Sequence, residues 1–141
     1  MPLKQHGTYS LHWQGQVLVQ ASAGTWNEEC SRNLQRDALA LLARRARDGQ
    51  SGHWAMLCDC TTWEGVTPEG SEAWWDFFQD CARHGLAAMA DVMPSRIHGL
   101  MLDEVTQRCA ALLPHQRCAS MAEAWAWLRA QGFEGSDAGT A

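Results

Sequence analysis

Hydrophobic and polar residues alternate at the start of the chain. Tyr9, Leu11 and Trp13 fall on one face of an extended segment, and residues 16–21 repeat the same alternation. Because Gly15 separates the two runs, we expect a β-hairpin. Two later runs, residues 53–59 and 86–93, are nearly continuous in hydrophobic residues. Such runs are typical of strands that are covered on both faces.

Segments in which hydrophobic residues recur at helical spacing lie between these runs. Residues 28–48 form an amphipathic pattern that follows Asn27, a favourable N-cap residue. Thr67 followed by Pro68 predicts the start of a second helix, which we expect to end at Gly85.

The last third of the chain continues the alternation of helix and strand. A helix is predicted within residues 97–113, and a short strand over residues 116–119. Ser120 and Glu123 have the spacing of a capping box, so a final helix starts there and stops at Gly132.

The resulting order is two strands, then helices and strands in alternation. This order predicts a single α/β domain over residues 8–133, with a mixed sheet of four or five strands. Residues 1–7 and 134–141 are expected to be flexible termini, because the tail consists of small and polar residues.

Composition narrows the classes of function. With 16 acidic and 11 basic residues the net charge is −5, which argues against a nucleic-acid partner. The sequence has neither an apolar run long enough for a transmembrane helix nor an apolar signal peptide. We therefore expect a cytoplasmic protein, in which the six cysteines are buried free thiols rather than disulfides.

Several segments together resemble one known group of proteins. They are the hairpin, the start of the first helix at residues 24–27, the strand that ends at Asp59, the segment 62–69 and the terminal segment 120–128. Together they resemble the SpoIIAA-like branch of the STAS superfamily, the fold of anti-sigma-factor antagonists. The resemblance implies a small bacterial protein of undefined role, and a fold that has been related to CRAL-TRIO lipid-transfer domains.

The same resemblance bears on regulation by phosphorylation. True antagonists carry a switch serine or threonine after an aspartate, where a strand ends and a helix starts. The matching stretch here begins with Asp59, and Cys60 stands where the serine is expected. Residues 63–66 also separate Thr61 from the next helix, so a phosphate there would not reach the helix N-terminus. A phospho-switched antagonist is therefore disfavoured.

A binding site is expected where the parallel strands end, because ligands in open sheets bind beyond the carboxyl ends of strands. The candidate ligand-binding residues in these segments are Trp26, Asp59, Thr61, Trp63 and Arg96. The aromatic rings would supply contact area, and the polar side chains would fix orientation. In the alternative interpretation, the two tryptophans only close the end of the sheet and Asp59 caps a loop.

Adjacent aromatic residues on helices indicate a second candidate surface. Trp74 and Trp75 point about 100° apart on a helix, so both cannot face the core centre, and with Phe78 they could form an exposed patch. Trp125 and Trp127 pose the same question. Such patches suit a protein partner or a homodimer interface. Alternatively, the bulky rings only seal the helix edges.

Sequence motifs for chemistry are sparse. The spacings of Cys58, Cys60, His115 and Cys118 do not match CxxC or HExxH patterns, so no metal is expected. Nucleotide-binding glycine motifs and a GxSxG elbow are missing too, and we expect neither a catalytic residue nor a cofactor. Cys60 is the best candidate for a reactive thiol, since a loop position near a helix could lower its pKa.

These observations lead to one functional hypothesis and one alternative. The hypothesis is a non-enzymatic STAS-like binding or regulatory module for an unidentified protein partner or small apolar ligand. The alternative is a carrier or sensor of a small apolar or lipid-like molecule. A lipid cavity would take up much of the core of a 141-residue chain, which counts against the alternative.

Overall fold

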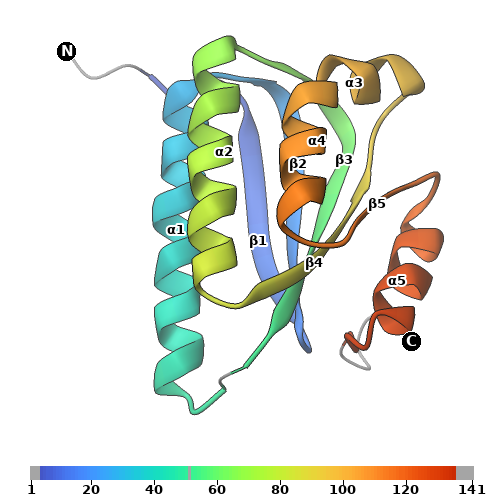
Figure 1. Cartoon of the computed structure of the whole chain (residues 1–141). Helices are drawn as coiled ribbons and strands as arrows, with labels where there is room; N and C mark the ends of the chain where they lie inside the picture. Colours follow the sequence, from blue (N-terminus) through green and yellow to red (C-terminus); the bar gives the residue numbers. More distant parts are fainter. Residues whose placement is uncertain (1–3, 51, 136–141) are drawn as a thin grey trace.

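The computed structural model describes residues 4–50 and 52–135, which form a five-stranded sheet with helices on both faces (Figure 1). The elements in chain order are β1 (Thr8–Gln14), β2 (Val17–Trp26), α1 (Glu28–Arg47), β3 (Trp54–Val66), α2 (Pro68–Arg83), β4 (Leu86–Val92), α3 (Arg96–Met101), α4 (Asp103–Leu112), β5 (His115–Cys118) and α5 (Met121–Ala130). The strands lie side by side in sequence order. β1 is antiparallel to β2, and the other neighbours are parallel. The predicted α/β domain with a mixed sheet is confirmed.

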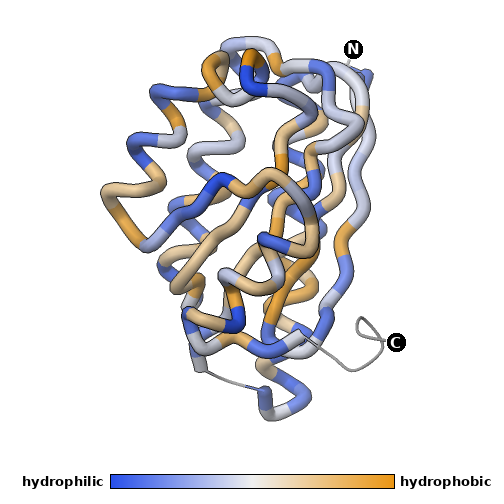
Figure 2. The backbone as a smooth tube through the Cα atoms, turned by 90° about the vertical axis from the view of Figure 1, so that its right-hand side faces the viewer, coloured by the Kyte–Doolittle hydropathy of each residue, from blue (hydrophilic) through white to orange (hydrophobic). Residues whose placement is uncertain are grey.

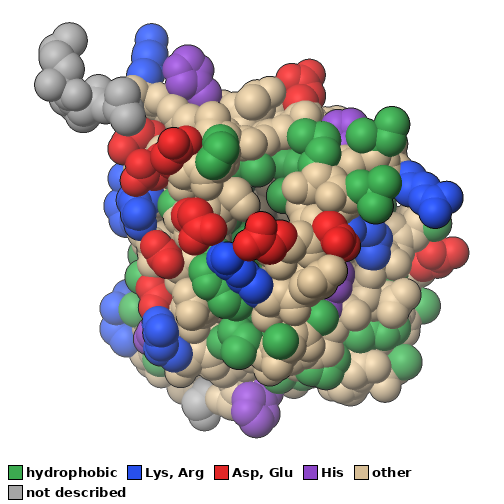
Figure 3. Space-filling view, turned by 45° about the horizontal axis from the view of Figure 1, so that its top comes forward, with side chains coloured by type: hydrophobic (Ala, Val, Ile, Leu, Met, Phe, Trp, Pro, Cys, Tyr) green, Lys and Arg blue, Asp and Glu red, His purple; other side chains and the backbone are tan. Residues whose placement is uncertain are grey.

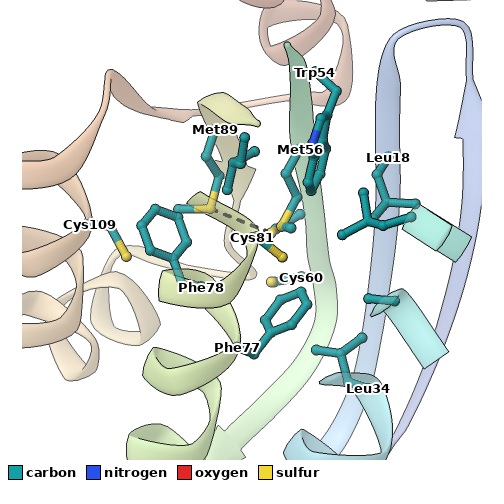
Figure 4. Close-up of a cluster of buried hydrophobic side chains, with 14 of the residues drawn as sticks. Leu18, Leu34, Trp54, Met56, Cys60, Phe77, Phe78, Cys81, Met89 and Cys109 are labelled. Atoms are coloured by element: carbon teal, nitrogen blue, oxygen red, sulfur yellow. Dashed lines mark hydrogen bonds between the residues drawn. The ribbon is translucent and has the colours of Figure 1, made fainter. Parts of the chain in front are cut away.

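The two faces of the sheet are covered unequally. Helices α1, α2 and α4 lie in a row over one face, the three-helix face, and α5 alone covers the other, the α5 face (Figure 1). Bulky side chains fill the three-helix face, where Met56 and Phe77 are fully buried (Figure 4). Small residues such as Ala90 and Ala124 line the α5 face, which lets this helix lie close to the sheet.

Hydropathy along the backbone follows this layering. The inner strands carry the long hydrophobic stretches, and the helices alternate between hydrophobic and hydrophilic residues (Figure 2). Strands β3 and β4 are covered on both faces, as their nearly continuous hydrophobic runs predicted. Among the described helices, none is both long and apolar enough to cross a membrane.

Side-chain caps fix three of the predicted helix starts. The side-chain oxygen of Asn27 accepts a hydrogen bond from the backbone N–H of Cys30 at 3.1 Å. Thr67 caps α2 in the same way, and Ser120 caps α5. Each cap pairs one of the backbone donors that a helix start leaves free.

Strands β2 and β3 are longer than the sequence pattern predicted. Residues 24–26 and 62–66 were expected to be loops, but they continue the parallel pair as far as Trp26 and Val66. The register shifts between Ala21 and Ala23, which adds one extra residue to β3 at this point. A bulge of this kind keeps the backbone paired while the strand bends.

The helix predicted within residues 97–113 is two helices, α3 and α4. Ser95 caps α3, and the backbone leaves the helical conformation at Leu102. Asp103 and Glu104 then occupy the first turn of α4, where the helix dipole favours negative charge. Because of this break, α3 lies at the carboxyl end of the sheet, whereas α4 lies over the three-helix face (Figure 1).

Parts of the two expected flexible termini are paired with the domain. The backbone N–H of His6 donates to the side chain of Asn27, and Asn27 donates to the carbonyl of Lys4. Near the other end, the backbone N–H of Gln16 donates to the carbonyl of Glu134 at 2.9 Å. The remaining terminal residues, 1–3 and 136–141, lie outside the described residues.

The close contact between α1 and α2 depends on Gly70. A Cβ atom there would lie 2.8 Å from Val66 and 3.0 Å from the backbone of Asn27. We therefore expect Gly70→Ala to lower the free energy of unfolding by about 1–3 kcal/mol, although alanine favours a helix by about 1 kcal/mol over glycine. Urea unfolding measures the change. Glu69→Ala in the same exposed turn is the control, with an expected effect within about 0.5 kcal/mol. A stabilised Gly70→Ala variant would contradict the contact.

Candidate functional site

Strand register places a row of polar side chains across the three-helix face. Gln20 on β2 is paired with Cys58 on β3, Cys58 with Asp91 on β4, and Asp91 with Arg117 on β5. Because partners in register share a face of the sheet, the four side chains lie next to one another. We call these four residues the polar row.

Asp91 is the buried carboxylate of the polar row, and only 3% of its surface is exposed. The Nε atom of Arg117 donates to one carboxylate oxygen at 2.8 Å. The other oxygen is bound by His115 Nε2 at 2.6 Å and by Arg117 Nη2 at 3.2 Å. All three bonds come from β5, so the short edge strand is fixed against β4 by charge as well as by its backbone.

These contacts decide the ionisation of Asp91. Burial alone would raise the pKa of the carboxyl, but the hydrogen bonds and charges of His115 and Arg117 outweigh burial and lower it below the ordinary value. Asp91 is therefore a carboxylate at neutral pH. Its charge is balanced by the guanidinium of Arg117.

Arg117 also binds the two helices that follow β4. Its Nη1 atom donates to the carbonyl of Gly99 in α3 at 3.2 Å, and Nη2 donates to Thr106 in α4 at 3.0 Å. The guanidinium thus connects the polar row to both segments above it. A Cβ atom on Gly99 would lie 2.9 Å from the guanidinium, so glycine allows this approach.

A cavity of about 70 Å³ lies over the polar row, between the sheet and helices α2 and α4. All four members of the row line it. Its walls are mainly apolar side chains, among them Trp26, Trp63, Trp74, Met93, Leu102 and Val105. Figure 3 brings forward the top of the molecule as drawn in Figure 1, where the parallel strands end. Acidic and basic side chains lie on the surface in this view. We call this space the rim cavity.

The polar side of the rim cavity continues along β2 from Gln20 to Ser22, which lies on the same face. Gln20 is 2% exposed and donates from Nε2 to Ser22 Oγ at 2.9 Å. Within residues 4–50 and 52–135, its carbonyl oxygen accepts a hydrogen bond only from the thiol of Cys58, at 3.9 Å. Thiols are weak donors, so the amide of Gln20 is only partly satisfied by the protein.

The structure brings two of the predicted binding residues together. Trp26, at the end of β2, and Trp63, near the end of β3, are almost fully buried and line the rim cavity. The bulge in β3 matters here, because it places Trp63 on the same face as Cys60, three residues earlier.

The other three predicted binding residues do not line the rim cavity. Asp59 lies on β3 between Cys58 and Cys60, which face the three helices, so it points to the opposite face. Its carboxylate accepts hydrogen bonds from the backbone N–H and hydroxyl of Thr61. Arg96 is exposed at the start of α3. Arg117 supplies the guanidinium of the cavity instead.

The position of Thr61 also bears on the phospho-switch. Five residues of extended chain lie between it and Thr67, the N-cap of α2, and the six steps along the backbone span about 20 Å at the rise of a strand. A phosphate on Thr61 would be too far from that helix N-terminus to bind it.

The predicted aromatic surface is largely an internal cluster. Phe78 is fully buried, which corrects the expectation that it is exposed. Trp74 and Trp75 stack on it with ring centroids 5.6 Å and 5.9 Å away, and both are half-buried. Trp125 and Trp127 are half-buried against the α5 face, and their role in partner contacts stays a prediction.

A different set of hydrophobic side chains is exposed. In α3, Ile97, Leu100 and Met101 expose 69%, 65% and 60% of their surface. Their spacing puts them on one side of the helix, and hydrophobic side chains gather at this corner in Figure 3. The helix predicted within residues 97–113 did not indicate this surface, because its hydrophobic residues were expected to face the core.

The cysteines are free thiols buried in the domain, as predicted. Burial raises the pKa of Cys60 to about 12, and the charge of Asp91 adds to the effect. The expectation of a lowered pKa at Cys60 is therefore wrong, because this residue lies inside a strand rather than in a loop at a helix start. Among the described residues, His, Cys, Asp and Glu side chains form no group of three that could hold a metal ion.

Comparison with known proteins identifies the fold. Neither a family model nor a curated protein matches the sequence. Seven chains of solved structures match, among them an uncharacterized protein of the DUF3478 family with a SpoIIAA-like fold from Shewanella loihica PV-4. That match has a TM-score of 0.62 and 13% identity, and covers 91% of this chain and 98% of the other. The fold is thus SpoIIAA-like, as the resemblance predicted.

Replacement of Asp91 tests the balance of charge at the polar row. Because the pKa of Asp91 is lower in the folded state, its ion pair stabilises the fold above about pH 4 and this stabilisation is lost as the pH falls further. We expect Asp91→Asn to lower the free energy of unfolding at pH 7 by about 3 kcal/mol. The difference from the wild type should shrink at pH 3.

Urea unfolding at both pH values measures this difference. Asp48→Asn, at the exposed end of α1, is the control and should change stability by less than about 0.5 kcal/mol at either pH. An equal loss for Asp91→Asn at pH 3 and pH 7 would show that its carboxylate is not the stabilising form.

Proposed function

We propose that this protein is a non-enzymatic binding or regulatory module in which the rim cavity takes a small molecule. The observation that carries the proposal is an apolar cavity with a built polar floor at the carboxyl end of parallel strands. Open α/β sheets bind ligands at this end, and few well-placed polar groups in an apolar pocket are typical of binding sites.

The state of the groups in the cavity supports binding rather than catalysis. The thiol of Cys60 is protonated at neutral pH because its pKa is about 12. Both oxygens of Asp91 already accept hydrogen bonds from His115 and Arg117. A nucleophile or a general base needs a free, reactive group, and these residues are engaged or inert.

The size of the cavity supports a small molecule rather than a lipid. Its volume is about 70 Å³, about five to seven times the roughly 10–15 Å³ that one water molecule requires. A carrier of a whole acyl chain would need a longer internal space. The lipid-like alternative is therefore weaker than a small ligand of a few heavy atoms.

The regulatory part of the proposal concerns α3. This helix presents exposed Ile97, Leu100 and Met101 to a protein partner, and the next residue, Leu102, lines the rim cavity. A molecule in the cavity would contact Leu102 and so change the position or rigidity of α3. Binding inside the cavity would then alter a surface outside it.

A pair of variants tests the proposed function. Val105→Phe places a large ring at a half-buried wall of the cavity, and Ala110→Phe adds the same ring at an exposed position of α4. After incubation with the small-molecule fraction of a cell extract, native mass spectrometry should show a bound mass that denaturation removes. We expect it on the wild type and on Ala110→Phe, and at least about tenfold less on Val105→Phe.

Two results would contradict the proposal. One is a bound mass that is equal on all three proteins, because binding would then occur outside the cavity. The other is the bare chain mass for the wild type after incubation.

A further inference from the structure

We infer that the rim cavity selects a neutral molecule with a short apolar body and one hydrogen-bonding group, and that Gln20 recognises this group. The inference rests on the proposed function, since it names the class of molecule for the same cavity. It follows from the charges, the hydrogen bonds and the size of the cavity.

The charges of the cavity are already balanced. Asp91 and Arg117 are the charged residues that line it, and they form a two-point ion pair with distances of 2.8 Å and 3.2 Å. Arg117 also donates hydrogen bonds to the carbonyl of Gly99 and to the hydroxyl of Thr106. An anion or a cation in the cavity would have no opposite charge of its own, and burying such a charge is costly.

One polar group in the cavity, the amide of Gln20, can still form further hydrogen bonds. Asp91 accepts three bonds, from His115 and Arg117, and has no strong need of another. Gln20 is almost fully buried, donates one N–H to Ser22 and accepts a weak thiol contact from Cys58. Within the described residues its second N–H has no acceptor, and its carbonyl has no strong donor. A hydroxyl or carbonyl of a bound molecule would complete this amide.

The walls and the volume define the rest of the molecule. Trp26, Trp63 and Trp74 supply aromatic faces around the cavity. A volume of about 70 Å³, set against roughly 10–15 Å³ for one water molecule, has room for about five or six heavy atoms and so suits a chain of three to five carbons. The class is therefore a short neutral alcohol or a related carbonyl compound.

Four probes with similar chains but different head groups test this class on the intact protein. They are 1-butanol, butyrate, butylammonium and 1-chlorobutane. The readout is the NMR signal of each indole N–H, assigned by single Trp→Phe variants. Trp26, Trp63 and Trp74 report the cavity, and Trp127 on the α5 face is the internal control.

We expect 1-butanol to shift the three cavity indoles and to bind at least about tenfold more tightly than either ion. Gln20→Met keeps the length of the side chain but removes its amide. It should reduce the preference for 1-butanol over 1-chlorobutane by about fivefold. Gln116→Met, at an exposed position of β5, is the matched control and should keep the wild-type preference.

The outcomes separate this inference from the proposed function. Cavity binding of butyrate or butylammonium as tight as that of 1-butanol would overturn the neutral class and leave the cavity as a binding site. An unchanged preference in a folded Gln20→Met variant would overturn the role of Gln20. If none of the four probes shifts the cavity indoles, the inference fails, and the native mass spectrometry of the wild type, Val105→Phe and Ala110→Phe decides the proposed function separately. Should Gln20→Met not fold, the wild-type ranking of the four probes still decides the neutral class.

Discussion

The buried carboxylate of Asp91 is the constraint on which this end of the molecule depends. A charge inside a central strand is stable only when its partners are close and well oriented, and both partners come from β5. β5 has only four residues, so its backbone alone provides little pairing. The same guanidinium that balances Asp91 binds Gly99 and Thr106. One ion pair therefore fixes the edge strand and both helices that follow β4.

The rim cavity is a consequence of the same row of residues. Along the sheet, the row of Leu18, Met56 and Met89 lies next to the polar row and is covered by the helices. At the polar row the helices meet an amide, a thiol and an ion pair, which apolar side chains do not pack against equally well. The long β2–β3 extension, bent by its bulge, then brings Trp26 and Trp63 over this point. The result is an apolar space above a polar floor.

Periodicity and caps predicted the fold because both are local. Asn27, Thr67 and Ser120 cap the helices they were expected to cap, and the hairpin about Gly15 forms as expected. Trp26 and Trp63 could be predicted to meet because both lie near the carboxyl ends of neighbouring parallel strands. Asp59 was misplaced because a strand alternates sides at every residue, and a binding site uses only one of them.

The remaining cavity residues depend on register between strands. Arg96 follows β4 directly in sequence, whereas Arg117 reaches Asp91 only because β5 pairs with β4 in one particular register. The hydrophobic pattern sets the register of a strand, and the four residues of β5 carry too little of that pattern to predict it. A usable signal was present nonetheless. Gln20 and Asp91 each interrupt a hydrophobic strand at a position that should face the core, and buried polar residues in such positions need partners.

Strand register builds a mainly apolar cavity over the polar row. A crystal structure of the protein under xenon pressure tests this arrangement, because xenon enters small apolar cavities without needing a polar partner. We expect xenon density between the sheet and helices α2 and α4, bounded by Trp26, Trp63 and Trp74. Side chains that fill this space, with no xenon bound there, would show that the polar row does not carry a cavity.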